Sequence, residues 1–204
     1  MARQEVNELK TRLLALLKKE ALKKGKFVLS SGKASNYYLD GRIITLTPEG
    51  AYSVASIILE LIKDKPRPFC GRDKLSSKKG RGKGIDAVGG PTLGADPIVG
   101  AVAALSHINK IALKTFIVRK AAKVHGTQRQ IEGPALKEGD RVILVDDVAT
   151  TGKSLIEAKE ALDKIGVIVE KAIVIVDRCE GAKENLAQQG LNLESIFTIE
   201  DLEI

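Results

Sequence analysis

The sequence is poor in the residues that mark several common classes of protein. Only 3% of its 204 residues are aromatic and none is tryptophan, which argues against a surface that stacks nucleic-acid bases. The two cysteines, Cys70 and Cys179, have no spacing typical of a metal or redox site, so we expect free thiols in a cytoplasmic protein. No apolar run reaches the roughly 18 residues of a membrane span, and the N-terminus lacks the apolar segment of a secretory signal.

The excess of positive charge is confined to one segment. Lys65–Gly84 carries eight basic residues and one acid, which accounts for the whole net charge of +7, so the rest of the chain is balanced. The segment is also rich in Gly and Ser, and we expect a solvated, flexible insertion. A role in attracting anionic substrates or nucleic acid remains the alternative for it.

The apolar pattern predicts a single α/β domain over residues 1–204. An amphipathic helix is expected over Gln4–Lys23, stopping at Gly25, and a second helix over 48–63 with Thr47 as its N-cap. Further along, short Val/Ile-rich runs alternate with helical stretches, which indicates a parallel sheet covered on both faces. The expected strands are Ile85–Val88, Thr115–Val118, Val142–Val145, Ala172–Val176 and Ile196–Ile199, and the expected helices are Ala95–Leu105, Lys153–Ile165 and Ala182–Gln189.

The most informative motif is Val142–Ser154, VILVDDVATTGKS. A buried strand is expected to end at Asp146 and Asp147, two adjacent carboxylates that need solvent, cations or hydroxyl donors nearby. The small and hydroxyl residues that follow open a helix, whose free N–H groups and positive dipole end suit a phosphate. Carboxylates beside a phosphate site match a ribose phosphate. The plain alternative is a strand, an acidic turn and a capped helix; a nucleotide P-loop is excluded because Asp147 stands where that motif needs glycine.

Three other stretches are candidates for substrate contacts. Arg119–Gly126 follows a strand with four cationic or titratable groups, which suits a mobile clamp on a diphosphate, although a solvated charged loop is the ordinary explanation. Ser35–Asp40 holds two tyrosines that suit a hood over a flat heterocycle, or else core packing. Arg178 ends a strand and suits a forked pair with a carboxylate or a pyrimidine edge, with a surface ion pair as the alternative.

Together these motifs resemble the orotate phosphoribosyltransferases, a group of the type I phosphoribosyltransferase family, over nearly the whole chain except Lys65–Gly84. The resemblance implies a parallel sheet flanked by helices, with about residues 1–45 contributing a small hood. It implies transfer of ribose 5-phosphate from phosphoribosyl diphosphate to orotate in pyrimidine biosynthesis. It also implies Mg²⁺ held mainly by substrate and water, with no direct protein ligand, and a homodimer whose subunits share active sites, with no membrane and no nucleic-acid partner.

The resemblance also assigns roles to individual residues. Asp146 and Asp147 would hold the ribose hydroxyls and stabilise positive charge in the transition state, and Lys123 would follow the leaving diphosphate. The orotate site would consist of Tyr38, Leu39, Thr150 and Arg178. The donor site would consist of Arg119, Lys120, Lys123, His125, Asp146, Asp147, Val148, Ala149, Thr150, Thr151, Gly152, Lys153 and Ser154.

The sequence departs from some relatives at two secondary positions. The loop Gly89–Ala95, expected to cradle the diphosphate through backbone N–H groups, lacks the lysine that some relatives carry there. Ser30 likewise replaces a lysine. Two rival functions remain: an enzyme of the same fold acting on uracil or a purine, and a regulator that senses phosphoribosyl diphosphate and binds nucleic acid. The stretch RKAAKVHG disfavours the first, and only the basic segment supports the second.

Overall fold

The chain folds around one six-stranded sheet with helices on both faces. The computed structural model describes residues 3–28, 34–63, 84–120 and 130–203. The elements, in chain order, are α1 (Arg3–Leu16), the π-helical turn η1 (Leu17–Ala21), β1 (Leu22–Val28), β2 (Ala34–Leu39), α2 (Arg42–Thr45), α3 (Pro48–Leu61), β3 (Ala87–Pro91), α4 (Ala95–Ile108), β4 (Lys114–Val118), β5 (Ile131–Glu132), β6 (Arg141–Ala149), α5 (Lys153–Asp163), β7 (Ile168–Asp177), α6 (Ala182–Gln188), β8 (Leu193–Thr198) and the 3₁₀ turn η2 (Glu200–Leu202).

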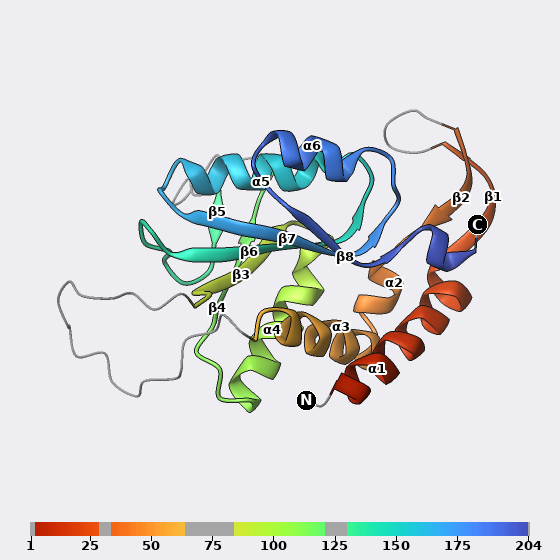
Figure 1. Cartoon of the computed structure of the whole chain (residues 1–204), viewed down its shortest axis with the longest axis horizontal. Coiled ribbons are helices and arrows are strands. Elements are labelled where there is room, and N and C mark those ends of the chain that lie inside the picture. The colour runs from red at the N-terminus through yellow and green to blue at the C-terminus, as the bar shows by residue number, and fades with distance from the viewer. Residues whose placement is uncertain (1–2, 29–33, 64–83, 121–129, 204) are drawn as a thin grey trace.

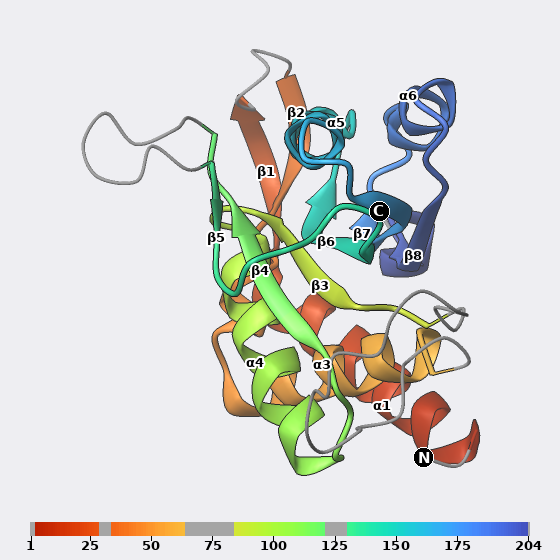
Figure 2. The ribbon, with the colours of Figure 1, turned by 90° about the vertical axis from the view of Figure 1, so that its left-hand side faces the viewer.

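The sheet order places β3, β6 and β7 at its centre. The strands run β5-β4-β3-β6-β7-β8, and every neighbouring pair is parallel except the short edge strand β5, which is antiparallel to β4. α5 and α6 cover one face, and α1, α3 and α4 lie on the other (Figures 1 and 2). The predicted α/β class with a mostly parallel, helix-flanked sheet is confirmed.

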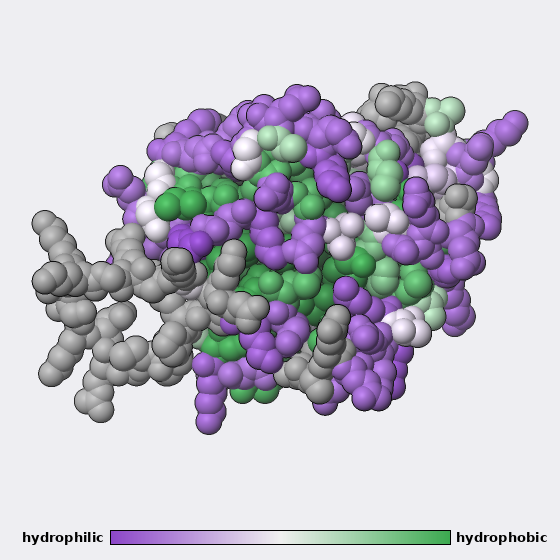
Figure 3. Space-filling view, in the orientation of Figure 1, coloured by the Kyte–Doolittle hydropathy of each residue, from purple (hydrophilic) through white to green (hydrophobic). Residues whose placement is uncertain are grey.

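Side-chain alternation along β6 builds a separate apolar core on each face. Ile143 and Val145 belong to the core shared with α1, α3 and α4, whereas Val142 and Leu144 pack with α5 and α6. This division follows from the two-residue period of a strand buried on both sides. In Figure 3, hydrophilic residues cover α5 and α6, and apolar residues are visible in a band between the two helical layers.

Most predicted elements are present, with differences at their ends. Thr47 caps α3 as expected, since its hydroxyl accepts a hydrogen bond from the Gly50 N–H at 3.1 Å. The first helix is shorter than predicted: its last turn, Leu17–Ala21, is π-type, and Leu22 already begins β1. β1 and the edge strand β5 were not predicted.

β1 and β2 form a separate antiparallel hairpin beside the main sheet. The Asp40 N–H, just after β2, donates to the Ala21 carbonyl at 3.2 Å and closes the base of the hairpin. The basic segment Lys65–Gly84 lies outside the described residues except for Gly84. Within the part of the chain that is described, no helix is long and apolar enough to span a membrane.

Candidate active site

The predicted carboxylate pair lies within β6 and not beyond its end. The ladder between β6 and β7 continues past Val145, pairing Asp146 with Val174 and Ala149 with Asp177. The expectation that the strand ends at Asp146 is therefore wrong. The ladder continues because β7 extends to Asp177 and offers backbone partners along the whole length. Both carboxylates consequently have a rigid backbone.

Asp146 and Asp147 are held by short local hydrogen bonds. The Ser154 hydroxyl donates to Asp146 Oδ2 at 3.0 Å, and the Asp147 N–H donates to Asp146 Oδ1 at 3.0 Å. The Val148 N–H donates to Asp147 Oδ1 at 2.8 Å. The hydroxyl donor that the adjacent carboxylates were expected to need is thus Ser154, from the first turn of α5.

Burial dominates the electrostatics of this pair. Burial raises the pKa of Asp146 well above its ordinary value, and the neighbouring charge of Asp147 raises that pKa further. Burial also raises the pKa of Asp147, while the Val148 N–H and the charge of Arg42 act in the opposite direction. Two carboxylates in this setting favour partners that donate hydrogen bonds or carry positive charge. Vicinal sugar hydroxyls and an oxocarbenium ion are such partners.

Two glycines allow the backbone to approach the carboxylates closely. A Cβ at Gly94 would lie 2.1 Å from Asp146 Oδ1 and 2.4 Å from Asp147 Oδ1. A Cβ at Gly41 would lie 2.8 Å from Asp147 Cβ. The predicted diphosphate loop Gly89–Ala95 is thereby placed next to the pair, although its first three residues belong to β3. Within it, the Thr92 hydroxyl donates to Asp96 Oδ2 at 2.9 Å, across the start of α4.

The predicted phosphate loop connects β6 to α5. Gly152 has φ +76°, a left-handed conformation that favours glycine, and α5 begins at Lys153. The Asn185 side chain donates to the Thr151 carbonyl at 2.9 Å and holds the loop from α6. The first N–H groups of a helix have no partner inside it and are available to an anion. The Lys153 side chain is 82% exposed and pairs with Glu157 at 3.8 Å.

The predicted cationic clamp begins where β4 ends. The Arg119 N–H donates to the Gln130 carbonyl at 2.8 Å, just beyond the ladder that joins β4 to β5. The Arg119 guanidinium lies 3.7 Å from Glu132 Oε1, and Lys120 is exposed. Lys123 and His125 lie outside the described residues. Arg119, at the start of the segment, is therefore fixed at the carboxyl end of β4, which is the same end of the parallel sheet as the carboxylate pair.

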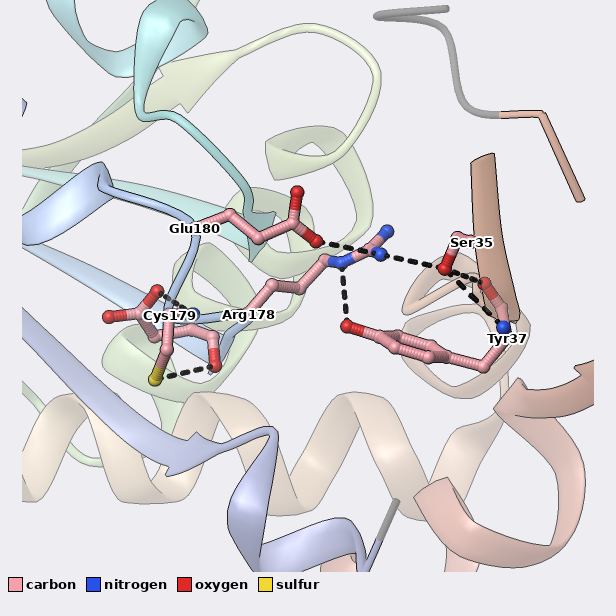
Figure 4. A network of polar contacts seen from close by, with 6 residues as sticks. Ser35, Tyr37, Arg178, Cys179 and Glu180 are labelled. Atoms are coloured by element: carbon pink, nitrogen blue, oxygen red, sulfur yellow. Dashed lines mark hydrogen bonds and ion pairs between the residues drawn. The ribbon is translucent and has the colours of Figure 1, made fainter. Parts of the chain in front are cut away.

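Arg178 is buried in a polar network between β7 and β2 (Figure 4). Its side chain is 5% exposed and pairs with Glu180 through Nη2 at 2.9 Å. Nε donates to the Tyr37 hydroxyl at 3.1 Å, Nη2 donates to Ser35 Oγ at 3.3 Å, and the guanidinium carbon lies 4.5 Å from the Tyr37 ring centroid. The ion pair considered as the plain alternative is present, but it is buried and not on the surface.

The two predicted pocket residues of β2 lie on opposite sides of that strand. Tyr38 is 37% exposed and packs its ring on Phe27 at a centroid distance of 5.7 Å, whereas Leu39 belongs to the core. Ser35 and Tyr37, which belong to the predicted hood stretch but were not assigned to the orotate site, are the β2 residues that reach Arg178. Their two-residue spacing on a strand was the available signal, because it puts both side chains on one face.

A second unpredicted feature is the ion pair that follows β2. Arg42 donates to both carboxylate oxygens of Asp40, at 2.8 and 2.9 Å. The hydrogen bond from Arg42 lowers the pKa of Asp40, and the positive charge of Arg42 also opposes the rise in the pKa of Asp147. Gly41, between the two residues, is the one in close approach to Asp147.

Comparison with known proteins agrees with this geometry. The family model described as the phosphoribosyl transferase domain matches residues 60–200. The orotate phosphoribosyltransferase of Nostoc sp. is 41% identical over 199 residues, which cover 98% of this chain and 87% of that protein.

Solved structures give the same result. The crystal structure of Mycobacterium tuberculosis H37Rv orotate phosphoribosyltransferase in complex with Fe(III) dicitrate superposes with a TM-score of 0.75 at 33% identity, covering 96% of this chain and 99% of that one. The structure of the same enzyme with 5-phospho-α-D-ribosyl 1-diphosphate has a TM-score of 0.72 at 29% identity, with the same coverage. The chain therefore belongs to the phosphoribosyltransferase family, within its orotate phosphoribosyltransferase group.

Proposed function

We propose that this chain transfers ribose 5-phosphate from phosphoribosyl diphosphate to N1 of orotate, giving orotidine 5′-monophosphate and diphosphate. The reaction belongs to pyrimidine biosynthesis. The observation that carries the proposal is the placement of a buried carboxylate pair, a helix start and a buried arginine at the carboxyl ends of β6 and β7. Ligands of open α/β sheets bind at this end of the strands. The relatives that match over nearly the whole chain are orotate phosphoribosyltransferases.

The donor is assigned to the loop between β6 and α5. Its 5-phosphate meets the N–H groups of Thr150–Ser154 and the positive end of the α5 dipole, and Val148 and Ala149 lead the chain into that loop. Asp146 and Asp147 accept hydrogen bonds from the two ribose hydroxyls. Support comes from the M. tuberculosis relative, whose structure contains 5-phospho-α-D-ribosyl 1-diphosphate.

The chemistry proposed for these residues needs no protein nucleophile. The bond between C1 of the ribose and the diphosphate oxygen breaks, and N1 of orotate forms the new bond to C1 while its N–H proton is released. Positive charge develops on the ribose, so the Asp146 and Asp147 carboxylates stabilise the transition state more than the ground state. Because both carboxylates are buried and lie on the paired strand β6, they need little rearrangement when positive charge develops on the ribose.

Mg²⁺ is proposed as the cofactor, held mainly by substrate and water. Among residues 3–28, 34–63, 84–120 and 130–203, no group of three or more His, Cys, Asp and Glu side chains is placed to hold a metal. Two carboxylates beside a diphosphate suit Mg²⁺, which keeps several waters and prefers phosphate oxygens. When bound there, it neutralises charge on the leaving diphosphate.

The leaving diphosphate is assigned to the Arg119–Gly126 segment and to the loop before α4. Arg119, Lys120, Lys123 and His125 supply positive charge and hydrogen bonds to the diphosphate, and Lys123 follows it as it departs. Gly94, in that loop, lies directly against both carboxylates of the pair. The acceptor is assigned to Thr150 and Arg178, with Tyr38 and Leu39 at the edge of the pocket and the β1–β2 hairpin as its hood.

A homodimer with shared sites is part of the proposal. Four exposed large apolar side chains lie on or just after α2, on α3 and in the loop before α4: Ile43, Leu46, Tyr52 and Leu93. Leu46 is the most exposed of these four, at 73%. Apolar residues gathered on neighbouring elements favour a protein contact. We propose a cytoplasmic location as well, in keeping with the free thiol at Cys179.

The test is an absorbance assay for loss of orotate. The purified chain is mixed with orotate, phosphoribosyl diphosphate and Mg²⁺, and each component is omitted in turn. We expect loss of orotate only in the complete mixture, with one diphosphate released per orotate consumed. Turnover with uracil or a purine in place of orotate would assign the acceptor to the first rival function. The regulator alternative gains no support from the relatives, and it predicts salt-dependent nucleic-acid binding with little turnover.

A further inference from the structure

We infer that Tyr37 and Ser35 are positioning residues that orient Arg178, so that the acceptor's carboxylate is held through Nη1 of that arginine and not through its forked Nε–Nη2 edge. The inference rests on the proposed function, because it concerns how the arginine assigned to orotate is presented. The network in Figure 4 carries it.

The Arg178 guanidinium has a fixed number of N–H groups to share between the network and a ligand. Arginine has five of them, in a fixed planar arrangement. Nε–H donates to the Tyr37 hydroxyl at 3.1 Å, and Nη2 donates to Ser35 Oγ at 3.3 Å and forms an ion pair with Glu180 Oε1 at 2.9 Å. Among the residues that the structure describes, none is bonded to Nη1. Both N–H groups of Nη1 are therefore available to a ligand, whereas Nε and Nη2 each already donate a hydrogen bond.

Ser35 and Tyr37, the two positioning residues, are themselves held in place by hydrogen bonds and by the strand that carries them. The Ser35 hydroxyl donates to the Tyr37 carbonyl at 2.7 Å, so its lone pairs face Arg178, and the Tyr37 ring lies 4.5 Å from the guanidinium carbon. Both residues sit on β2, which is paired with β1. The guanidinium plane is thus fixed by the hairpin, from residues more than 140 positions away in sequence.

A tight turn after β7 brings Glu180 to the same guanidinium. Cys179 has φ +55°, and its N–H donates to Asp177 Oδ1 at 2.9 Å, which forms a tight turn after β7. Glu180 is thereby directed back onto Arg178. With one carboxylate already on Nη2, an incoming carboxylate meets the lowest repulsion and an available donor at Nη1.

The consequence is specific to the acceptor. Loss of the Tyr37 hydroxyl frees Nε and lets the guanidinium rotate, which weakens its contact with orotate but leaves the donor site at Asp146 and Asp147 intact. A hydrogen bond of this kind corresponds to a change of about twofold to tenfold in affinity. The KM for orotate should rise by that factor in Tyr37→Phe, while the KM for phosphoribosyl diphosphate stays within about twofold of the wild-type value.

The experiment measures both KM values and kcat for the wild type, Tyr37→Phe, Ser35→Ala and Arg178→Ala. Thr11→Ala is the control, because it also removes an exposed hydroxyl, one that donates to the Asn7 carbonyl on α1 and takes no part in the network. We expect the largest rise in orotate KM for Arg178→Ala, smaller rises for the two positioning variants and none for the control. Thermal melting of every variant checks that the fold is kept.

The possible failures are distinguishable. No turnover in the wild type would refute the proposed function and the inference together. Normal turnover with a raised orotate KM in Arg178→Ala, but wild-type values in both Tyr37→Phe and Ser35→Ala, would refute the inference alone. An equal rise in the KM values for both substrates would also overturn it, because that outcome indicates a general structural role and not orientation of the acceptor.

Discussion

Adding one methyl group at Gly94 should disable the site without disturbing the fold. In Gly94→Ala, the new Cβ would lie 2.1 Å from Asp146 Oδ1 and 2.4 Å from Asp147 Oδ1, well under the 3.0 Å that real Cβ contacts respect. Each carboxylate therefore has to move by several tenths of an ångström to about 1 Å. The backbone of Gly94 is right-handed, with φ −58°, so alanine fits the backbone and the effect comes from the contact alone.

The expected magnitude follows from the size of that displacement. A misplacement of about 1 Å in a catalytic group costs about 10²-fold in rate. We expect kcat/KM for phosphoribosyl diphosphate to fall by about that factor in Gly94→Ala, measured as initial rates of orotate loss at varied donor concentration. Strain of this size also costs about 1–3 kcal/mol of unfolding free energy, which thermal melting detects.

The matched control is Gly100→Ala, the same substitution inside α4, the helix that Gly94 precedes. A Cβ at Gly100 meets nothing within 4 Å, and the residue lies inside α4, where alanine is favoured over glycine by about 0.5–1 kcal/mol. It should keep wild-type kinetics and melt at the same temperature or slightly higher. Wild-type kcat/KM in Gly94→Ala would refute the reasoning, because it would mean that the carboxylate positions do not matter.

Three further predictions concern the carboxylate pair, the clamp and a helix cap. Burial raises the pKa of Asp146, so stability that the wild type has with a protonated Asp146 is lost as pH rises through the raised pKa. Asp146→Asn should therefore melt at a higher temperature than the wild type at neutral pH, with the difference closing toward about pH 4, and its kcat should fall. Identical melting profiles for the two proteins across this pH range would contradict the direction of the pKa shift. Lys123→Ala should lower kcat by a factor of about 10²–10³. Wild-type kcat in initial-rate measurements with both substrates saturating would show that Lys123 is not part of the clamp. Thr47→Ala removes the acceptor for the Gly50 N–H and should cost about 1 kcal/mol in urea unfolding, whereas Thr47→Ser should not.

The elements that local sequence patterns determine were predicted well. The Val/Ile runs of the central strands β6 and β7 are buried on both faces, and such strands have a distinctive composition. The Thr47–Pro48 start of α3 depends only on adjacent residues, and so was also predictable. The hydrogen bond between Asp146 and Ser154, eight positions apart, agrees with the expectation that the carboxylates need hydroxyl donors nearby, but Ser154 itself was not predicted as that donor.

The features that were missed depend on contacts between distant segments. β1, with the sequence LKKGKFV, has weak strand propensity of its own, and pairing with β2 overrides it. β6 runs through Asp146 and Asp147 because the neighbouring strand supplies backbone partners there. The contacts of Arg178 with β2 join residues more than 140 positions apart, and the alternation along β2 shows only that Ser35 and Tyr37 share a face, not which residue they meet.

The most direct test of the central claim is a crystal structure of the chain with phosphoribosyl diphosphate and Mg²⁺. The account predicts the 5-phosphate on the N–H groups of Thr150–Ser154, and the two ribose hydroxyls within hydrogen-bond distance of Asp146 and Asp147. It also predicts that Nη1 of Arg178 faces the acceptor side of the ribose C1. A 5-phosphate bound away from the start of α5, or ribose hydroxyls out of reach of both carboxylates, would contradict the account.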